Sequence, residues 1–238
     1  MSENKIANKK RLVVLTGAGI SAESGFKTFR DAGGLWENYS VEDVASIEGW
    51  YRNPELIINF YNDLRVQLEK AQPNAGHIIL AELEKYFDVR IITQNVDNLH
   101  EKAGSTNVIH LHGELTKVRP VNTDSKVYDI GYSKMKYGDK SPDGELLRPH
   151  IVWFGEAVPM ITEAAKLVRS ADIFAVVGSS LVVYPAAGLI HDLRGHTEAF
   201  LIDPKEVSVP SGMKFKVIRE VASKGVAIMR DELLKELN

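Results

Sequence analysis

The stretch RLVVLTGAGISA, residues 11–22, decides the fold class of this chain. It begins with an apolar run and ends in glycines, a pattern typical of a buried strand that enters a tight turn. Glycines at the end of a strand let the backbone approach a pyrophosphate, and a helix that begins there stabilises the anion. The stretch therefore predicts the first strand of an α/β fold, followed by either a phosphate-binding loop or a purely structural turn.

Further apolar runs repeat this arrangement along the chain, at residues 89–97, 108–113, 173–180 and 198–203. Segments with helical spacing separate several of them, at residues 74–86, 159–170 and 183–193, and the C-terminal segment is amphipathic. Because strands that alternate with helices form parallel sheets, we expect an α/β fold with a doubly wound, mainly parallel, Rossmann-like sheet.

Two regions break this alternation and indicate inserts on the sheet. Residues 31–72 hold a Gly-rich loop and a long helix, and residues 114–149 are polar and weakly periodic. We expect a single domain over residues 1–238, with a smaller inserted subdomain at residues 114–149. The Rossmann-like core is predicted to cover approximately residues 1–30, 73–113 and 150–238.

The composition excludes several classes of protein. The chain of 238 residues has no cysteine, which excludes disulfides, thiol nucleophiles and cysteine-ligated metal centres. A net charge of −3 does not indicate the basic surface that is typical of nucleic-acid-binding proteins. The apolar run near the N-terminus is too short for a signal peptide or a membrane span. We expect a cytoplasmic protein that binds neither nucleic acid nor membranes.

The glycine motif GAGISA, residues 17–22, differs from the dehydrogenase fingerprint. No clear second strand with a terminal acid follows about 20 residues later, as that fingerprint requires. A polar, Gly-rich segment follows instead, in which Phe29 and Arg30 are candidates to cover a bound ring and to bind phosphates. A tight structural turn explains the motif alone equally well.

Polar residues follow other predicted strands, at the edge where a doubly wound sheet binds ligands. Gln94, Asn95 and Asp97 are placed to contact ribose hydroxyls or an amide, although an Asn/Asp helix cap explains them equally well. Residues 177–180, VGSS, repeat the pattern of a strand, a glycine and hydroxyl groups. Asp203 is placed to bind an adenosine ribose, or else it is a turn residue before a proline.

His110 and His112 lie two residues apart, so on a strand they would share a face. A metal site would need further ligands, and neither an HExxH motif nor a cysteine supplies them. His112 lies at the strand end, where a neutral imidazole suits general base catalysis. His110 lies deeper, and we expect it to be a packed, hydrogen-bonded histidine.

Five motifs together carry a family resemblance: GAGISAESGFKTFRDAGGLW, TQNVDNLHEKAG, HLHGEL, LRPHIVWFGE and VGSSLVVYPAAGL. In this order and spacing the chain resembles the sirtuins, the NAD-dependent protein-lysine deacylases. The resemblance covers about residues 12–238. It implies an enzyme that transfers the acyl group of a lysine to NAD and releases nicotinamide and 2′-O-acyl-ADP-ribose.

The resemblance also implies roles for individual residues. His112 would be the base that takes a proton from a ribose hydroxyl, with Asn95 and Asp97 as the other catalytic residues. The implied NAD-binding residues are Gly17, Ala18, Gly19, Ser21, Ala22, Phe29, Arg30, Trp36, Gln94, Asn95, Val96, Asp97, Gly178, Ser179, Ser180, Asp203 and Ala227.

Acylated-lysine proteins are the implied partners, and we expect a monomer. The peptide would lie as an added strand between residues 152–156 and the segment around residues 182–184, so that its backbone is recognised. The implied substrate-binding residues are Tyr61, Leu64, Arg65, Val152, Phe154, Gly155, Glu156, Val182 and Tyr184.

The residues around Tyr61 bear on the branch of the family. The chain is similar to the branch that also removes succinyl groups, which carries a Tyr-x-x-Arg motif, but here Leu64 stands three residues after Tyr61 and the arginine is Arg65. Because a buried succinyl carboxylate without a cation is costly, we expect removal of acetyl or other neutral acyl groups at least as good as removal of succinyl groups. Arg65 lies within one turn of Tyr61, which leaves open that it reaches the pocket.

Many sirtuins hold a structural zinc with four cysteines in the region of residues 114–149. This chain has Arg119 and Pro120 where the first would fall, and we expect no zinc. An apolar cluster in its place is predicted from composition: Val127, Tyr128, Ile130, Tyr132 and Tyr137.

Two other functions stay open at this stage. One keeps the NAD site but transfers ADP-ribose to a protein or hydrolyses NAD, and its products would differ. The other is an NAD-sensing module without turnover, which ranks lowest because Asn95, Asp97 and His112 are all present.

Overall fold

The computed structural model describes residues 9–26, 39–123 and 125–237. The predictions for Phe29, Arg30 and Trp36 lie outside these residues. Among the described helices none is long and apolar enough to cross a membrane.

A parallel sheet of six strands forms the larger part of the molecule, in the order β3-β2-β1-β7-β8-β9. The fold class expected from the sequence is confirmed. The strands are β1 (Arg11–Thr16), β2 (Asp88–Thr93), β3 (Val108–His110), β7 (Ile173–Val177), β8 (Glu198–Ile202) and β9 (Lys216–Ile218). The short edge strand β9 was not predicted, because its residues are exposed or only half-buried and form no apolar run.

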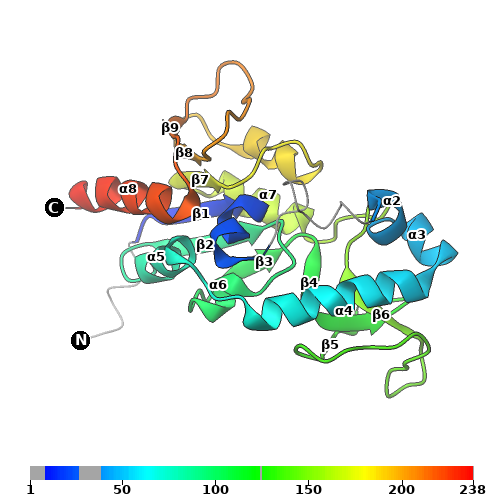
Figure 1. Ribbon diagram of the computed structural model, residues 1–238. Helices are drawn as coiled ribbons and strands as arrows, with labels where there is room; N and C mark the ends of the chain where they lie inside the picture. The colour runs from blue at the N-terminus through cyan, green and yellow to red at the C-terminus, as the bar shows by residue number, and fades with distance from the viewer. Residues whose placement is uncertain (1–8, 27–38, 124, 238) are drawn as a thin grey trace.

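Helices cover both faces of this sheet, which Figure 1 shows around the central strand β1. On one face Leu12 and Val14 pack with α5 (Ala75–Leu83) and α8 (Ala222–Lys235). On the other face Val13 and Leu15 pack with α7 (Ile161–Arg169) and the 3₁₀ helix η3 (Ala186–Asp192). The strand is therefore buried on both sides, which explains its uninterrupted apolar run. Residues 183–193 were expected to form an α-helix, and the 3₁₀ form over Ala186–Asp192 corrects that expectation.

The sheet changes winding direction between β1 and β7. From β1 the chain proceeds to β2 and β3 on one side, and from β7 it proceeds to β8 and β9 on the other. A crevice forms at the carboxyl ends of the two strands at such a switch point, and ligands bind there in open α/β sheets. Two short helices, α1 (Ala18–Ser21) and α6 (Leu99–Lys102), and the 3₁₀ turn η1 (Ala22–Ser24) lie beyond these strand ends.

A smaller unit lies beside the sheet (Figure 1). It contains a three-stranded antiparallel sheet in the order β5-β4-β6 and a group of helices. The strands are β4 (Gly113–Pro120), β5 (Tyr128–Asp129) and β6 (Leu147–Ile151), and the helices are α2 (Val41–Val44), α3 (Ile47–Arg52) and α4 (Pro54–Lys70). Residues 114–149 were expected to form a polar, weakly periodic insert. In the structure β4 and β6 pair at Gly113–Ile151 and again from Val118–Pro149 to Pro120–Leu147, with a shift of register between these pairs.

Hydrogen bonds from side chains of α4 connect the region of residues 114–149 to the rest of the molecule. The Asn62 amide donates to the Met135 carbonyl at 2.8 Å and accepts from the Met135 N–H at 3.0 Å, so it pairs like a strand residue. Arg65 Nε donates to the Leu115 carbonyl at 2.6 Å. These bonds anchor the insert at backbone atoms, a role that side-chain packing was expected to fill.

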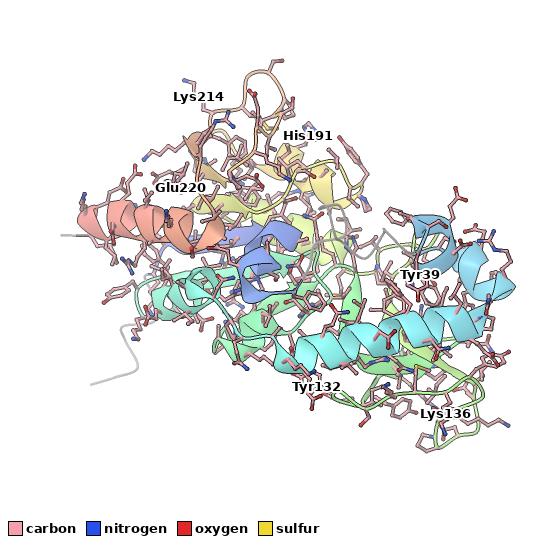
Figure 2. The ribbon with its side chains drawn as sticks, in the orientation of Figure 1. Tyr39, Tyr132, Lys136, His191, Lys214 and Glu220 are labelled. Carbon is pink, nitrogen blue, oxygen red and sulfur yellow. The ribbon has the colours of Figure 1, made fainter. Side chains whose placement is uncertain are left out.

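The expected apolar cluster of the insert is only partly correct. Tyr128, Ile130 and Tyr132 pack against the core of the small unit. Figure 2 shows Tyr132 on the side of α4 where the insert lies, and its hydroxyl accepts from the Asn98 amide at 3.0 Å. Val127 is exposed, and Tyr137 is half exposed with its ring edge against Trp50. The aromatic residues thus join existing packing and form no separate cluster.

Candidate active site

Two glycine turns meet at the switch point of the sheet. Gly17 donates its N–H to the Val177 carbonyl at 3.1 Å, and Gly19 donates to the Gly178 carbonyl at 2.9 Å. A Cβ on Gly17 would lie 2.7 Å from the Gly178 oxygen, and Gly178 itself has a φ of 62°. Only glycine permits this contact, so both turns bring bare backbone to the ends of β1 and β7.

Behind the first turn lies a buried polar network made by three of the predicted residues. Ser21 Oγ donates to Asp97 Oδ2 at 2.9 Å, and the Asn95 amide donates to the Gly17 carbonyl at 3.1 Å and to Ser21 Oγ at 3.2 Å. Asp97 Oδ1 accepts from the Leu99 N–H at 3.1 Å. Burial raises the pKa of the Asp97 carboxyl, and these donors offset part of that shift.

Asp97 thus accepts from the N–H of the first residue of α6, which is close to the helix-cap alternative, although the N-cap position itself is Asn98. One carboxylate oxygen accepts from the helix N–H while the other accepts from Ser21 in the glycine turn, and contact of Asp97 with a ligand stays a prediction. Val96 is buried beside them, and its carbonyl accepts from the Leu115 N–H at 2.8 Å.

Gln94 connects the ends of three strands. Its side-chain amide donates to Ser179 Oγ at 2.8 Å, beyond β7, and its backbone N–H donates to the Thr16 carbonyl at the end of β1. Its own carbonyl accepts from His112 Nδ1 at 2.8 Å. The side chains predicted from three separate sequence motifs are therefore brought together at one edge of the sheet.

The bond between His112 and Gln94 fixes the tautomer of the imidazole. A carbonyl oxygen only accepts, so Nδ1 carries the hydrogen and Nε2 keeps a lone pair. Burial lowers the pKa of His112, and the bond to Gln94 offsets part of that shift. His112 is therefore a neutral imidazole at neutral pH, with Nε2 as the proton-accepting atom.

His110 has a different environment from His112. Its Nδ1 lies 3.1 Å from the Asn95 carbonyl and its Nε2 lies 2.9 Å from Glu101 Oε1, so both nitrogens face acceptors. Burial alone would lower the pKa of His110, but Glu101 raises it above its usual value. The expectation of a packed, hydrogen-bonded histidine is confirmed. The strand β3 ends at His110, so the two histidines do not share a strand face as the sequence had suggested.

The residues predicted for the adenosine end lie beyond β7 and β8 and on α8. Ser180 is exposed, and Ala227 is half-buried on α8. Asp203 Oδ1 accepts from the Lys205 N–H at 2.8 Å. This bond forms a turn, which was the alternative to ribose binding for this residue. Glu23 links the glycine turn to the start of α8 by accepting from Ser223 N–H and Oγ at 2.9 and 2.6 Å.

The segment predicted to bind substrate backbone runs from Val152 to Glu156, directly after β6. Its Val152 N–H donates to the His112 carbonyl at 2.9 Å, which ties it to the candidate base. Phe154 donates to the Ala45 carbonyl and accepts from the Ile47 N–H, and its side chain is half exposed. Val182 and Tyr184, on the second predicted segment, are exposed.

The three predicted pocket residues of α4 differ in their surroundings. Tyr61 is buried, and its hydroxyl accepts from Trp153 Nε1 at 3.0 Å. Leu64 is buried in the apolar core of the small unit. Arg65 is fully buried and donates to Leu115 and to Asn62 Oδ1, which directs its guanidinium to the insert. The sequence had left open that Arg65 reaches an acyl pocket, and in the structure its guanidinium is bonded to Leu115 and Asn62.

Two buried histidines under the site were missed by the sequence argument. His100 Nε2 lies 3.0 Å from Thr16 Oγ1, and the His77 and His100 rings lie 4.9 Å apart. Burial lowers the pKa of His77 to about 4 and that of His100 well below its usual value. Trp153 was also missed, although it lies within the motif LRPHIVWFGE. Only its place between two predicted substrate residues signalled it.

The residues at the switch point fit a dinucleotide. Glycines lie in the turns that end β1 and β7, and the amides of Gln94 and Asn95, the Asp97 carboxylate and the hydroxyls of Ser21 and Ser179 lie beside them. For a metal, no group of three or more His, Asp or Glu side chains is present in the part of the chain that the structure describes.

The chain was compared with known proteins. The family model described as the Sir2 family matches residues 17–185. An NAD-dependent protein deacylase of Bacteroides thetaiotaomicron is 55% identical over 230 residues, covering 94% of this chain and 98% of that protein. One of Helicobacter pylori is 47% identical, covering 95% and 98%. Among solved structures, a Sir2 homologue mutant in complex with ADP-ribose has a TM-score of 0.85 and 38% identity, covering 98% of this chain and 97% of the other. A Sir2 homologue in complex with NAD has a TM-score of 0.85 and 37% identity, covering 98% and 93%.

Proposed function

The chain belongs to the Sir2 family, and on that premise we propose that it is an NAD-dependent protein-lysine deacylase whose base is His112. The observation that carries the proposal is the position of His112. Its Nδ1–H is fixed on the Gln94 carbonyl, which leaves Nε2 unprotonated at the edge of the sheet where the glycine turns meet. The products are the free lysine, nicotinamide and 2′-O-acyl-ADP-ribose.

The dinucleotide is held by the turns after β1 and β7. Backbone groups of residues 17–19 and 178–180 bind phosphate and ribose oxygens, because the glycines admit close approach. Asn95 and Asp97 bind the nicotinamide end, and Ser21 holds the Asp97 carboxylate in place. Asp203 and Ala227 lie near the adenosine end. When bound, NAD supplies the ribose carbon that takes the acyl oxygen as nicotinamide leaves.

His112 moves the proton. Its Nε2 accepts a proton while Nδ1–H stays bonded to the Gln94 carbonyl, so the imidazolium that forms keeps its orientation. The lowered pKa of His112 keeps the imidazole neutral at pH 7. A positioned base of this kind contributes roughly 10²–10⁴-fold to the rate.

The acylated peptide binds as a strand between the segments 152–156 and 182–184. Phe154 uses its N–H and carbonyl on Ala45 and Ile47, and the N–H groups of Val152 and Trp153 are bonded within the enzyme, so the peptide pairs with the backbone groups of the segment that these bonds leave available. Backbone pairing of this kind tolerates many side chains, which suits an enzyme that acts on several proteins.

Neutral acyl groups are the preferred substrates. Leu64 is buried and apolar, and the Arg65 guanidinium is bonded to the Leu115 carbonyl and to Asn62. A succinyl carboxylate bound next to Tyr61 would therefore not find the Arg65 cation free to pair with it, and burial of an unpaired carboxylate is costly.

A panel of acyl-lysine peptides with NAD, followed by mass spectrometry, tests the function. We expect acyl-ADP-ribose and free lysine from the wild type, and loss of both in His112→Ala. His191→Ala is the matched control, because His191 is exposed on η3. ADP-ribose attached to protein, or free ADP-ribose as the main product, would contradict the proposal.

A further inference from the structure

The segment of residues 152–156, which presents backbone to the peptide, is bonded to the buried ion pair of Arg148 and Glu156. Arg148 Nη1 and Nη2 donate to Glu156 Oε1 and Oε2 at 2.6 and 2.8 Å, a bidentate pair. Arg148 Nη2 also donates to the Ile151 carbonyl at 2.9 Å. The Glu156 carboxylate accepts from the Trp153 N–H at 2.8 Å. Both ends of the segment and its middle are therefore fixed to the same ion pair.

The Trp153 ring continues this arrangement toward the long helix α4. The Arg148 guanidinium lies over the ring at 3.6 Å from its centroid, and Trp50 stacks on the ring at 5.4 Å. The indole Nε1 donates to the Tyr61 hydroxyl, so one chain of contacts joins Glu156, Arg148, Trp153 and Tyr61. The ion pair thus fixes both the backbone of the segment and a neighbour of the acyl pocket.

Burial makes this pair sensitive to the charge of Glu156. Only 2% of the Arg148 side chain and 17% of the Glu156 side chain are exposed, which limits screening by water. Arg119 Nη2 lies 3.4 Å from the same carboxylate. Although burial alone would raise the pKa of Glu156, Arg148 holds it below its usual value. A neutral side chain at this position would leave the buried Arg148 cation without its counter-ion.

We propose that Glu156 is a positioning residue, which acts through Arg148 to hold the segment 152–156 in the shape that binds acylated peptides. The proposal rests on the deacylase function and deepens it. The carboxylate is bonded to Arg148 and to the Trp153 N–H, so it acts on the enzyme's own backbone and makes no charged contact with the peptide. Its loss is expected to weaken peptide binding and to leave NAD binding intact, because the glycine turns at the switch point do not contact the pair.

The test compares Glu156→Gln with the wild type on two acetyl-lysine peptides, one with arginines beside the acetyl-lysine and one with none. We expect KM for both peptides to rise by about tenfold or more, by the same factor, because bonds between charged groups are lost on the enzyme. KM for NAD is expected to stay within about twofold. Glutamine is expected to be tolerated, because Glu156 borders an open cavity of about 450 Å³. Asp143→Asn, which removes an exposed ion pair with Lys126 on the same insert, is the control and leaves both constants unchanged.

Each outcome of this comparison either supports or overturns the positioning role of Glu156. A larger loss for the arginine-bearing peptide would mean that Glu156 contacts the peptide directly, and unchanged KM values in an active Glu156→Gln would also overturn the proposal. If Glu156→Gln unfolds, Arg148→Lys keeps the cation without the fork, and an equal rise in both peptide constants is expected there too. Unchanged constants in that variant would overturn the proposal as well. A wild type that deacylates neither peptide would instead overturn the proposed function.

Discussion

The parallel sheet and the small unit beside it are stabilised by different kinds of interior. The sheet buries strands such as β1, whose Leu12–Leu15 run packs helices on both faces. The small unit has an apolar core as well, but it also buries the guanidinium groups of Arg65 and Arg148. Under the sheet edge the buried titratable pair is His77 and His100, and burial keeps both neutral.

This difference matches the tasks proposed for the two regions. The sheet places its polar groups at strand ends, where a cofactor and a base are needed. The small unit uses arginines to bind backbone carbonyls: Arg65 donates to the Leu115 carbonyl, and Arg148 donates to the Ile151 carbonyl at the start of the segment proposed to present the peptide. Substitutions at the sheet edge are thus expected to lower kcat. Substitutions in the small unit are expected to weaken peptide binding or to destabilise the insert.

The largest effect is expected at the sheet edge. His112→Ala should lower kcat by roughly 10²–10⁴-fold, because the proton acceptor Nε2 is lost, while the binding of NAD measured by calorimetry persists. The wild-type kcat/KM should fall on acidification with an apparent pKa below 6.5, since only the neutral imidazole acts as base and burial lowers its pKa. An acid limb above that value, or an active His112→Ala, would contradict the assignment.

The next largest effect is expected on the free energy of unfolding when Arg65, a buried cation of the small unit, is replaced. Burial lowers the pKa of Arg65 to about 10, so the group is still charged at pH 7. Arg65→Met should reduce the free energy of unfolding by about 3 kcal/mol, because the Leu115 carbonyl and one Asn62 contact lose their donor. Urea unfolding measures the change.

Arg52→Met is the matched control, since its guanidinium pairs with Asp43 at the surface. A change of about 0.5 kcal/mol or less is expected there. Equal losses in the two variants would remove the distinction between buried and exposed arginines on which the comparison depends.

Acid should lower the stability of the folded protein through His77, which is buried under the edge of the parallel sheet. In the unfolded chain this imidazole titrates near 6.5, while in the folded protein its pKa is about 4. The unfolded state therefore binds more protons between these values, and stability falls as pH falls. The contribution of His77 amounts to about 2 kcal/mol lost between pH 7 and pH 5.

His77→Leu should reduce that loss, measured by urea unfolding at both pH values, with His191→Leu as the exposed control. Part of the dependence should remain, since the pKa of His100 is lowered as well. If His77→Leu shows the full wild-type dependence on pH, the buried pair is not its source.

The smallest effect concerns acyl preference. Leu64→Arg should raise the ratio of desuccinylation to deacetylation by about tenfold, because a cation then faces the acyl position beside Tyr61. Leu64→Met keeps the position apolar and serves as control, with thermal unfolding to check both variants. An unchanged ratio in a folded Leu64→Arg would show that this position does not line the acyl pocket.

Much of the sheet could be predicted because its signal is local. The apolar runs around β1, β2, β7 and β8 and the glycines after them predicted strands, turns and the edge where the site lies. The antiparallel strands β4 and β6 could not be predicted. They carry Glu114, Lys117 and Arg148, and their pairing depends on partners far apart in the chain.

The same limit applies to individual side chains. The position of Arg65, within one turn of Tyr61, left an acyl contact open, because helical spacing shows which residues are neighbours but not what faces them. The Leu115 and Met135 backbone groups that bind Arg65 and Asn62 come from the distant insert. Likewise, Glu156 was predicted as a substrate residue, and only the folded chain brings it to Arg148.

The sequence by itself determined the strands β1, β2, β7 and β8, the glycine turns after them, the candidate base and the absence of cysteine, because each depends on residue type and near neighbours. Tertiary structure alone decided the tautomer of His112, the charge pairing of His110 and the part that arginines take in the small unit. Those properties depend on which acceptor lies within hydrogen-bond distance and on how much water is excluded, and both are set by segments that meet only when the chain folds.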